Sequence, residues 1–380
     1  MNLLRFAEPV TVAFKKSAGG ATVTFEANRD YVIANSQLER IMQDQNIRNR
    51  AFKISKLESR LPNFNVSARK AGNQRLLIFN GSGGYGDQIM TWPVAKLLAS
   101  MGYEIHVMTD PGNNVCWWNF PWVKTVNTCP MPFEQVKMYD YVLIFEAVVN
   151  MDEHQDQEHP VDTMLRKIGI APASVDASLK VTHPMFSYLE MESTKKFDGK
   201  QIGLFQLSAA NPVRCLQPAD SVFMLMKLAQ EFPDIHWLAL YDEFVNVQYK
   251  ELCEAKLKEA EITNAEAYSF GLLRELWAMT TKALIVIAPD SMMAHISGSC
   301  GIPCVGLWGS VAPGNRVRYY KNHRPVWHQK VCPHSPCFAY TNTFPKYCPP
   351  RPTPRTTCEV LAAISPADVI SEAKIALGRS

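Results

Sequence analysis

The chain lacks several features that would assign it to a specialised class of protein. No apolar run reaches the ~18 residues that a membrane span needs, and the opening MNLLRFAEPVTVAFKK lacks the pattern of a signal peptide. Neither charge is in large excess, because the 380 residues carry a net charge of +3. These absences predict a cytoplasmic protein, and the charge neither requires nor excludes a polyanionic partner.

Two nucleotide-binding signatures are also missing. The loop with Gly83, Gly84 and Gly86 does not have the G-x-G-x-x-G spacing of dinucleotide sites, and it has no Lys-Ser or Lys-Thr pair that would make a P-loop. Ten cysteines in a chain of this length do not impose a disulfide framework. With 47% hydrophobic and 20% charged residues, the composition is that of an ordinary globular protein. The length allows two or three domains.

The sequence does contain a repeated strand–helix pattern, which restarts after a charged linker near residues 190–200. The expected buried strands are 75–80, 103–109 and 139–147 before the linker, then 201–208, 235–242, 282–290 and 302–310, with helices at 87–101 and 221–232. Such alternation is typical of α/β domains with parallel sheets covered by helices. We expect a ligand site in a cleft between two such domains, at the carboxyl ends of the strands.

The two ends of the chain have a different pattern. Residues 10–16 and 21–28 alternate apolar and polar residues around a Gly-Gly pair, which predicts a β-hairpin, and 36–61 reads as a charged helix. Near the other end, Ser365 is an expected N-cap, with Pro366 at the first helical position and Gly378 as the stop. The predicted organisation is a hairpin–helix appendage (1–72), two Rossmann-like domains (73–192 and 193–364) and a C-terminal helix (365–380).

The glycine-rich loop raises the question of what Asp87 does. The glycines allow the backbone to approach a ligand closely, and the following helix directs its positive end toward that point. One reading makes Asp87 only a helix cap in a tight turn. The other makes it a group that reacts.

A second candidate lies where a buried strand ends at Pro289. Asp290 and Ser291 begin a helix whose first turn holds His295, and the unpaired amides of such a turn suit a diphosphate. His295 can neutralise or hydrogen-bond a phosphate there. A capped helix with a satisfied histidine remains the alternative.

Together the two segments resemble the heptosyltransferases, glycosyltransferase family nine, over roughly residues 75–378. GYGDQIMTWP is similar to the first signature of that family, and PDSMMAHISGSCGIPCVGLWGS to the second. The matching positions are Gly86, Asp87, Thr91 and Pro93, then Asp290, Ser291, His295, Gly301, Pro303 and Gly309. Ser208 and Arg214 take the places of a small residue and a basic residue, while Gln217-Pro218 replaces Trp-Pro and Met292 replaces a common glycine.

This resemblance implies a GT-B fold that holds a nucleotide-diphosphate sugar mainly in the second domain and the acceptor in the first. It implies inverting, metal-independent transfer, with Asp87 as the base that takes the proton of an acceptor hydroxyl. Binding of the donor and its phosphates is expected at Gly84, Gly86, Ser208, Arg214, Asp290, Ser291 and His295. A lipopolysaccharide-type glycan is the favoured acceptor, and ADP-heptose is the reference donor.

Two other segments allow a functional or a structural reading. Trp117, Trp118 and Trp122 fall in CWWNFPWV, where aromatic rings can stack on an acceptor sugar or base, or simply pack against the first sheet. MDEHQDQEH at residues 151–159 is rich in metal-ligand types, but it lacks a defined ligand spacing and reads as a solvated loop.

Four cysteines fall in a proline-rich stretch that has little core to hold it, namely Cys332, Cys337, Cys348 and Cys358. Four thiolates around a structural zinc ion would hold it. Unmetallated thiols are an equal alternative, and two disulfides are less expected in a reducing compartment.

Two further functions remain open. One is a phage-encoded enzyme that glycosylates a hydroxylated base in DNA, suggested by the N-terminal hairpin, the aromatic loop and the basic run RVRYYKNHR at 316–324. The other is an inactive nucleotide- or sugar-binding module on the same fold. For each function we expect a monomer.

Overall fold

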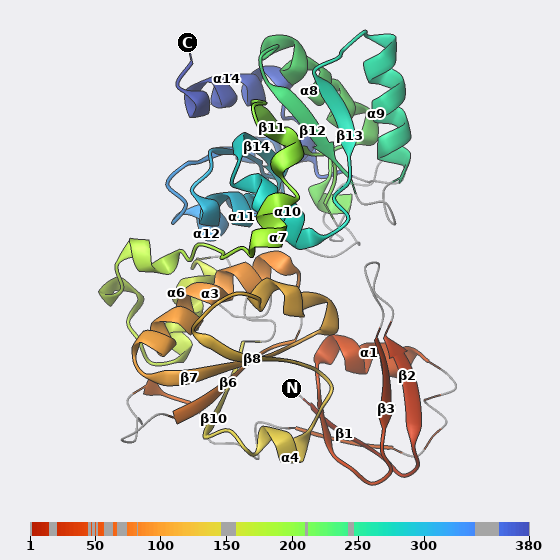
Figure 1. Cartoon of the computed structure of the whole chain (residues 1–380), viewed down its shortest axis with the longest axis vertical. Coiled ribbons are helices and arrows are strands. Elements are labelled where there is room, and N and C mark those ends of the chain that lie inside the picture. Colours follow the sequence, from red (N-terminus) through yellow and green to blue (C-terminus); the bar gives the residue numbers. More distant parts are fainter. Residues whose placement is uncertain are drawn as a thin grey trace. The chain divides into compact units, whose positions relative to one another are not determined.

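The structure is a computed structural model that describes residues 2–14, 21–44, 47, 50, 52–56, 64–66, 74–81, 83–145, 157–209, 212–241, 247–338 and 357–379. The chain forms two compact units (Figure 1). The first comprises Met1–Gln155 and Pro160–Met185, and the second Asp156–His159 and Phe186–Ser380. None of the described helices is long and apolar enough to cross a membrane.

This division differs from the expected boundary between residues 192 and 193. Helix α7 (Tyr188–Glu192) packs against α10 (Leu273–Thr280) of the second unit. Nε of buried Arg274 donates to Oε1 of Glu190 at 2.7 Å, which fixes α7 there. The charged segment that reads as a linker therefore belongs to a folded unit, because its carboxylate pairs with a buried cation.

The first unit is built on a parallel sheet of order β10-β6-β7-β8. Its strands are β6 (Gln74–Asn80), β7 (Tyr103–Thr109), β8 (Val123–Thr128) and β10 (Tyr141–Ile144). Helix α3 (Tyr85–Ser100) packs against β7 and against α6 (Pro160–Lys167). The remaining turns are η3 (Pro111–Trp117), η4 (Pro172–Ser174) and η5 (Ala177–Lys180). Because β10 and β7 flank β6 on opposite sides, the loops after β6 and β10 leave the sheet at its topological switch point.

The N-terminal strands belong to this unit and are not a separate appendage. An antiparallel sheet has the order β5-β1-β4-β9, and β2 pairs with β3 as the expected hairpin, which is confirmed. The elements are β1 (Asn2–Phe6), β2 (Val10–Phe14), β3 (Ala21–Phe25), β4 (Tyr31–Ile33), α1 (Asn35–Gln43), β5 (Phe52–Lys56), β9 (Met131–Pro132) and α4 (Phe133–Val136). Strand β9 follows β8 in the chain, so it ties this sheet to the parallel one.

The single helix expected over 36–61 is wrong in part. Helix α1 ends at Gln43, and Phe52–Lys56 is a strand that pairs antiparallel with β1. A charged local pattern predicted a helix there, but pairing with a distant strand decides the conformation.

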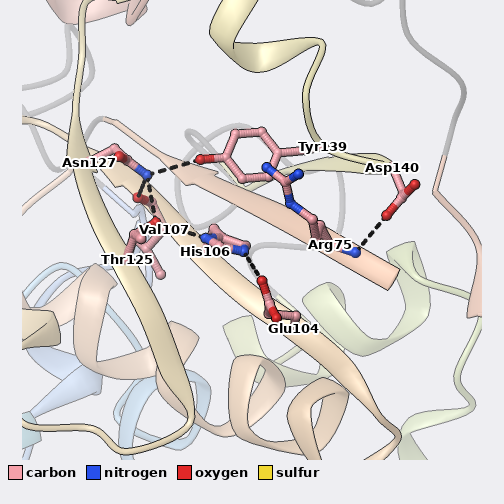
Figure 2. Close-up of polar contacts among 8 residues, drawn as sticks. All are labelled: Arg75, Glu104, His106, Val107, Thr125, Asn127, Tyr139 and Asp140. Atoms are coloured by element: carbon pink, nitrogen blue, oxygen red, sulfur yellow. Dashed lines mark hydrogen bonds and ion pairs between the residues drawn. The ribbon is translucent and has the colours of Figure 1, made fainter. Parts of the chain in front are cut away.

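One face of the parallel sheet changes from apolar to polar along its strands. Toward the carboxyl ends, Met108 packs in a cluster with Leu3 and Phe133 of the neighbouring elements. Two residues earlier on the same face, buried His106 contacts Oγ1 of Thr125 through Nδ1 and Oε1 of Glu104 through Nε2, both at 2.8 Å (Figure 2). The polar half of this face thus satisfies itself with side-chain hydrogen bonds.

The second unit contains a six-stranded parallel sheet of order β13-β12-β11-β14-β15-β16. The strands are β11 (Ile202–Gln206), β12 (His236–Leu240), β13 (Ala265–Tyr268), β14 (Ala283–Pro289), β15 (Cys304–Leu307) and β16 (His323–Val326). The helices and turns are η6 (Lys195–Phe197), η7 (Pro212–Arg214), α8 (Pro218–Glu231), α9 (Val247–Glu259), α11 (Met292–Cys300), α12 (Gly314–Val317), η8 (Gln329–Val331), α13 (Glu359–Ala362) and α14 (Pro366–Leu377). The strand order reverses between β11 and β14, which is its switch point.

The last helix begins and ends as expected. Ser365 Oγ accepts the backbone N–H of Asp368 at 3.2 Å, Pro366 occupies the first turn, and Gly378 ends α14 with φ 66°. These cap predictions are confirmed, because capping depends on residues within one turn of each other.

Candidate functional site

In the first unit, the loop after β6 brings a carboxylate to the start of α3. Gly83 has φ 101°, and a Cβ built there would lie 2.5 Å from Oδ2 of Asp87, so this position requires glycine. Oδ2 of Asp87 accepts the backbone N–H of Gly84, the N-cap, at 2.6 Å. Gly86 occupies the first turn of the helix. Asp87 is therefore a helix-capping residue in this structure, and its role as a base remains a proposal.

A polar network beneath this loop was not predicted from the sequence. Asn80 ends β6, and its carbonyl accepts Nε2 of Gln88 at 3.0 Å and Oγ1 of Thr109 at 3.0 Å. Its amide nitrogen donates to Oγ1 of Thr91 at 2.8 Å, and that hydroxyl donates to the carbonyl of Asp87 at 2.9 Å. The signal in the sequence was a polar residue at the last position of a buried strand, directly before the glycines.

The three tryptophans proposed for the acceptor lie in different environments. Trp117 is 1% exposed and its Nε1 donates to Oε1 of Gln88 at 2.9 Å, so it packs in the core as the structural reading expected. Trp122 is half-buried and stacks on Phe120 with ring centroids 4.7 Å apart. Trp118 is 46% exposed. Of the three, Trp118 has the exposure that stacking on a ligand requires.

In the second unit, the loops after β11 and β14 meet at the switch point of the sheet. Gln206 ends β11, and its Nε2 donates to the carbonyl of Ser208 at 2.7 Å. Its Oε1 accepts the hydroxyl of Ser291, the N-cap of α11. Gln206 thus joins the two loops, although it belongs to no motif recognised in the sequence.

The loop after β11 is closed on itself by Cys215. The Sγ of this buried residue accepts the backbone N–H of Ala209 at 3.0 Å and donates to the carbonyl of Ala209 at 3.2 Å. This closure places Arg214 so that its Nη1 donates to the backbone carbonyl of Asp290 at 3.0 Å. Ser208, Arg214, Asp290 and Ser291 are therefore brought together at the ends of β11 and β14.

Two polar atoms of this group are buried and have no hydrogen-bond partner. They are Nε of Arg214 and Oδ2 of Asp290, whose residue is 6% exposed. A buried unpaired N–H and a buried unpaired carboxylate oxygen each cost free energy. By contrast, both ring nitrogens of His106 in the first unit are paired. The unpaired atoms mark a site that a polar ligand would complete.

His295 sits four residues into α11 and is 3% exposed. Burial, together with the nearby cations Arg316 and Arg214, lowers the pKa of His295 to about 3. The imidazole in this structure is therefore neutral at physiological pH, and of the two roles considered for it the neutral form serves the hydrogen bond to a phosphate. Its Nδ1 lies 3.3 Å from the hydroxyl of Tyr320, which also forms a hydrogen bond with Ser299. A hydroxyl that donates to Nδ1 leaves the proton on Nε2, where it can be given to a ligand.

The cysteine-rich segment is described only in part. Cys348 lies outside the described residues, as do residues 151–156 of the acidic stretch. Burial raises the pKa of Cys358, and the neighbouring Cys337 and Cys332 raise it further, so these three thiols lie near one another. Within the described ranges, no group of three or more His, Cys, Asp or Glu side chains is arranged to hold a metal ion. Zinc therefore has no support from the described residues.

The basic run considered for DNA is exposed only in part, at Arg318 and Lys321. Arg316 is 2% exposed, and Nε of Arg324 donates to Oε2 of Glu372 at 2.5 Å. A stripe that follows a nucleic-acid backbone needs free, exposed cations. No observation on this run favours a DNA substrate.

Comparison with known proteins agrees with this arrangement. Residues 246–348 match the model of glycosyltransferase family 9 (heptosyltransferase), a range that contains the Asp290 signature. Over these residues the chain is similar to the heptosyltransferases. No curated protein matches it by sequence.

Solved structures show the same fold at low sequence identity. ADP-heptose LPS heptosyltransferase II of Escherichia coli matches with a TM-score of 0.61 and 12% identity over 80% of this chain and 98% of that chain. A family 9 glycosyltransferase of Veillonella parvula matches with a TM-score of 0.60 and 12% identity, over 84% of this chain and 99% of that chain. The iron-containing dodecameric glycosyltransferase TibC of enterotoxigenic E. coli matches with a TM-score of 0.56 and 13% identity, over 81% of this chain and 80% of that chain. The chain therefore has the GT-B fold of these glycosyltransferases.

Proposed function

We propose that this protein transfers a sugar from a nucleoside-diphosphate sugar to an acceptor hydroxyl, with inversion and without a catalytic metal ion. The observation that carries the proposal is the meeting of Arg214 with Asp290 at the switch point, where both residues keep a buried unpaired polar atom. The guanidinium and the amides at the start of α11 suit a diphosphate. The carboxylate of Asp290 suits a sugar hydroxyl or a ribose.

In the proposed reaction the acceptor oxygen bonds to the anomeric carbon while the bond from that carbon to the diphosphate oxygen breaks. Asp87 takes the proton of the acceptor hydroxyl. Arg214, the amides after Ser291 and Nε2–H of the neutral His295 stabilise the negative charge that develops on the leaving diphosphate. Trp118 is proposed as a surface on which the acceptor stacks. A lipopolysaccharide-type glycan is proposed as the acceptor, by analogy with the E. coli heptosyltransferase II.

The deciding experiment is a thermal-shift panel with ADP, UDP, GDP and CMP on the wild type and on Arg214→Ala. A nucleotide at a hundred times its dissociation constant stabilises by about 2.7 kcal/mol, which raises the melting temperature by roughly 5–11 °C for a unit of this size. One nucleotide should raise the melting temperature of the wild type and lose that effect in Arg214→Ala. Arg379→Ala, which breaks a surface pair with Asp234, should keep the effect.

Failure of all four nucleotides to shift the melt of the wild type would contradict a nucleotide-sugar donor. The same shift in the wild type and Arg214→Ala would place the nucleotide elsewhere. If the nucleotide binds but no acceptor is ever glycosylated, the inactive binding module would be the better description.

A further inference from the structure

The loop after β15 carries two polar residues that lie outside the two signatures shared with the heptosyltransferases. Asn315 and Arg316 lie in α12 and are 7% and 2% exposed. Nδ2 of Asn315 is buried and has no hydrogen-bond partner, although its Oδ1 accepts Nη2 of Arg318 at 3.3 Å. This unpaired donor is of the same kind as Nε of Arg214. A buried N–H without a partner needs a reason.

The course of the chain places these two residues toward the start of α11. Strand β15 ends at the carboxyl edge of the sheet, and the chain then returns to the amino edge, where the parallel strand β16 begins. On this return Tyr320 reaches His295 in the first half of α11. Asn315 and Arg316 precede Tyr320, so they lie closer to the carboxyl edge, which is where the loops after β11 and β14 hold Arg214 and Asp290. Arg316 and Arg214 both act electrostatically on His295, in agreement with this placement.

A buried histidine holds α12 in place. Nε2 of His159 lies 2.9 Å from the backbone carbonyl of Arg316, and its ring packs edge-on against Tyr319 at 4.8 Å. Burial lowers the pKa of His159 well below its usual range, so the ring is neutral and its Nε2–H donates to that carbonyl. The next residue, Pro160, already belongs to the first unit. Nη1 of Arg316 in turn donates to the carbonyl of Asn315 at 3.0 Å.

We propose that Asn315 and Arg316 bind the diphosphate of the donor from the loop after β15, and that His159 is the residue that positions them. The proposal rests on the nucleotide-sugar function proposed above. It adds the loop after β15 to the loops after β11 and β14 as a part of the same binding site. The amide Nδ2 supplies a hydrogen bond to a phosphate oxygen, and the guanidinium supplies positive charge. The loops after β11 and β14, which carry Arg214 and Asp290, would then hold one side of the diphosphate, and α12 would hold the other side.

The test measures the affinity of the full-length protein for ADP, UDP, GDP and inorganic pyrophosphate by isothermal titration calorimetry, together with the melting temperature of the free protein. Asn315→Ala should weaken binding of pyrophosphate and of the preferred nucleotide about tenfold, the size of a hydrogen bond to a charged group. The melting temperature of Asn315→Ala should be unchanged or higher, because the substitution removes a buried Nδ2 that has no hydrogen-bond partner. The matched control is Asn322→Ala, since Nδ2 of exposed Asn322 donates to the carbonyl of Gly301 at the other end of α11, at 2.7 Å.

Asn322→Ala should lower the melting temperature and leave both affinities unchanged. For the positioning role, His159→Gln retains a terminal N–H donor and should bind nearly as the wild type does, whereas His159→Leu should lose affinity severalfold. Equal affinity of the wild type and Asn315→Ala, with a lower melting temperature for the variant, would overturn the inference and leave the proposed function standing. Failure of the wild type to bind any of the four ligands would overturn both.

Discussion

Nη1 of Arg214 donates to the backbone carbonyl of Asp290 at 3.0 Å, across the two central strand ends of the six-stranded sheet. This bond holds the guanidinium through a backbone atom, so it does not use the side-chain carboxylate of Asp290. Nε of Arg214 and Oδ2 of Asp290 therefore remain buried and unpaired. A cation and a carboxylate that come from neighbouring strand ends can serve different parts of one ligand, which is what a nucleoside-diphosphate sugar presents.

Asp87→Asn should separate catalysis from binding. The amide oxygen of asparagine can still accept the N–H of Gly84, so the cap of α3 persists, but the group can no longer take a proton. We expect turnover to fall by roughly 10²- to 10⁴-fold, with the nucleotide-induced thermal shift unchanged.

The matched control for Asp87→Asn is Asp220→Asn, which changes the acidic residue at the same helical position, in the first turn of α8. It should leave turnover unaffected. Wild-type turnover in Asp87→Asn would refute the base assignment and reduce Asp87 to the capping role seen in the structure.

His295→Gln should make the protein less sensitive to acid. The folded pKa of His295 is about 3, below its unfolded value of 6.5, so the unfolded chain binds the extra proton between these pH values. Stability is therefore fully present above pH 6.5 and falls as the pH decreases through that window, by about 2 kcal/mol between pH 7 and 5 for one such group. Urea unfolding at pH 7 and pH 5 measures it. The loss between the two pH values should be smaller in the variant than in the wild type, and an equal loss would contradict the buried, neutral state.

Trp117→Ala and Trp118→Ala should affect different properties. Trp117 is 1% exposed, and its truncation should cost about 3–5 kcal/mol of unfolding free energy. Trp118 is 46% exposed, so its truncation should change stability by about 0.5 kcal/mol or less. If Trp118 stacks on the acceptor, Trp118→Ala should raise KM for the acceptor while KM for the donor stays constant. Steady-state kinetics with each substrate varied in turn is the measurement, and an unchanged acceptor KM would exclude that role.

Much of the candidate site could be predicted because its cues are local. The glycines, Asp87 and the start of α3 fall within a few residues, as do Pro289, Asp290, Ser291 and the start of α11. Strand ends, turn glycines and helix starts of this kind depend on backbone conformation over one turn. The neutral state of His295 could not be predicted in this way, since it follows from burial and from cations far away in the chain.

The sequence by itself determined the alternation of strands and helices, the caps of α14 and the two segments that begin the site helices, because short-range patterns specify them. Only the tertiary structure decided that Phe52–Lys56 is a strand, that Trp117 is buried while Trp118 is not, and that Gln206 joins Ser208 to Ser291. These outcomes depend on partners distant in the chain. Strand pairing, burial and hydrogen bonding between loops are properties of the folded chain as a whole, and no local pattern contains them.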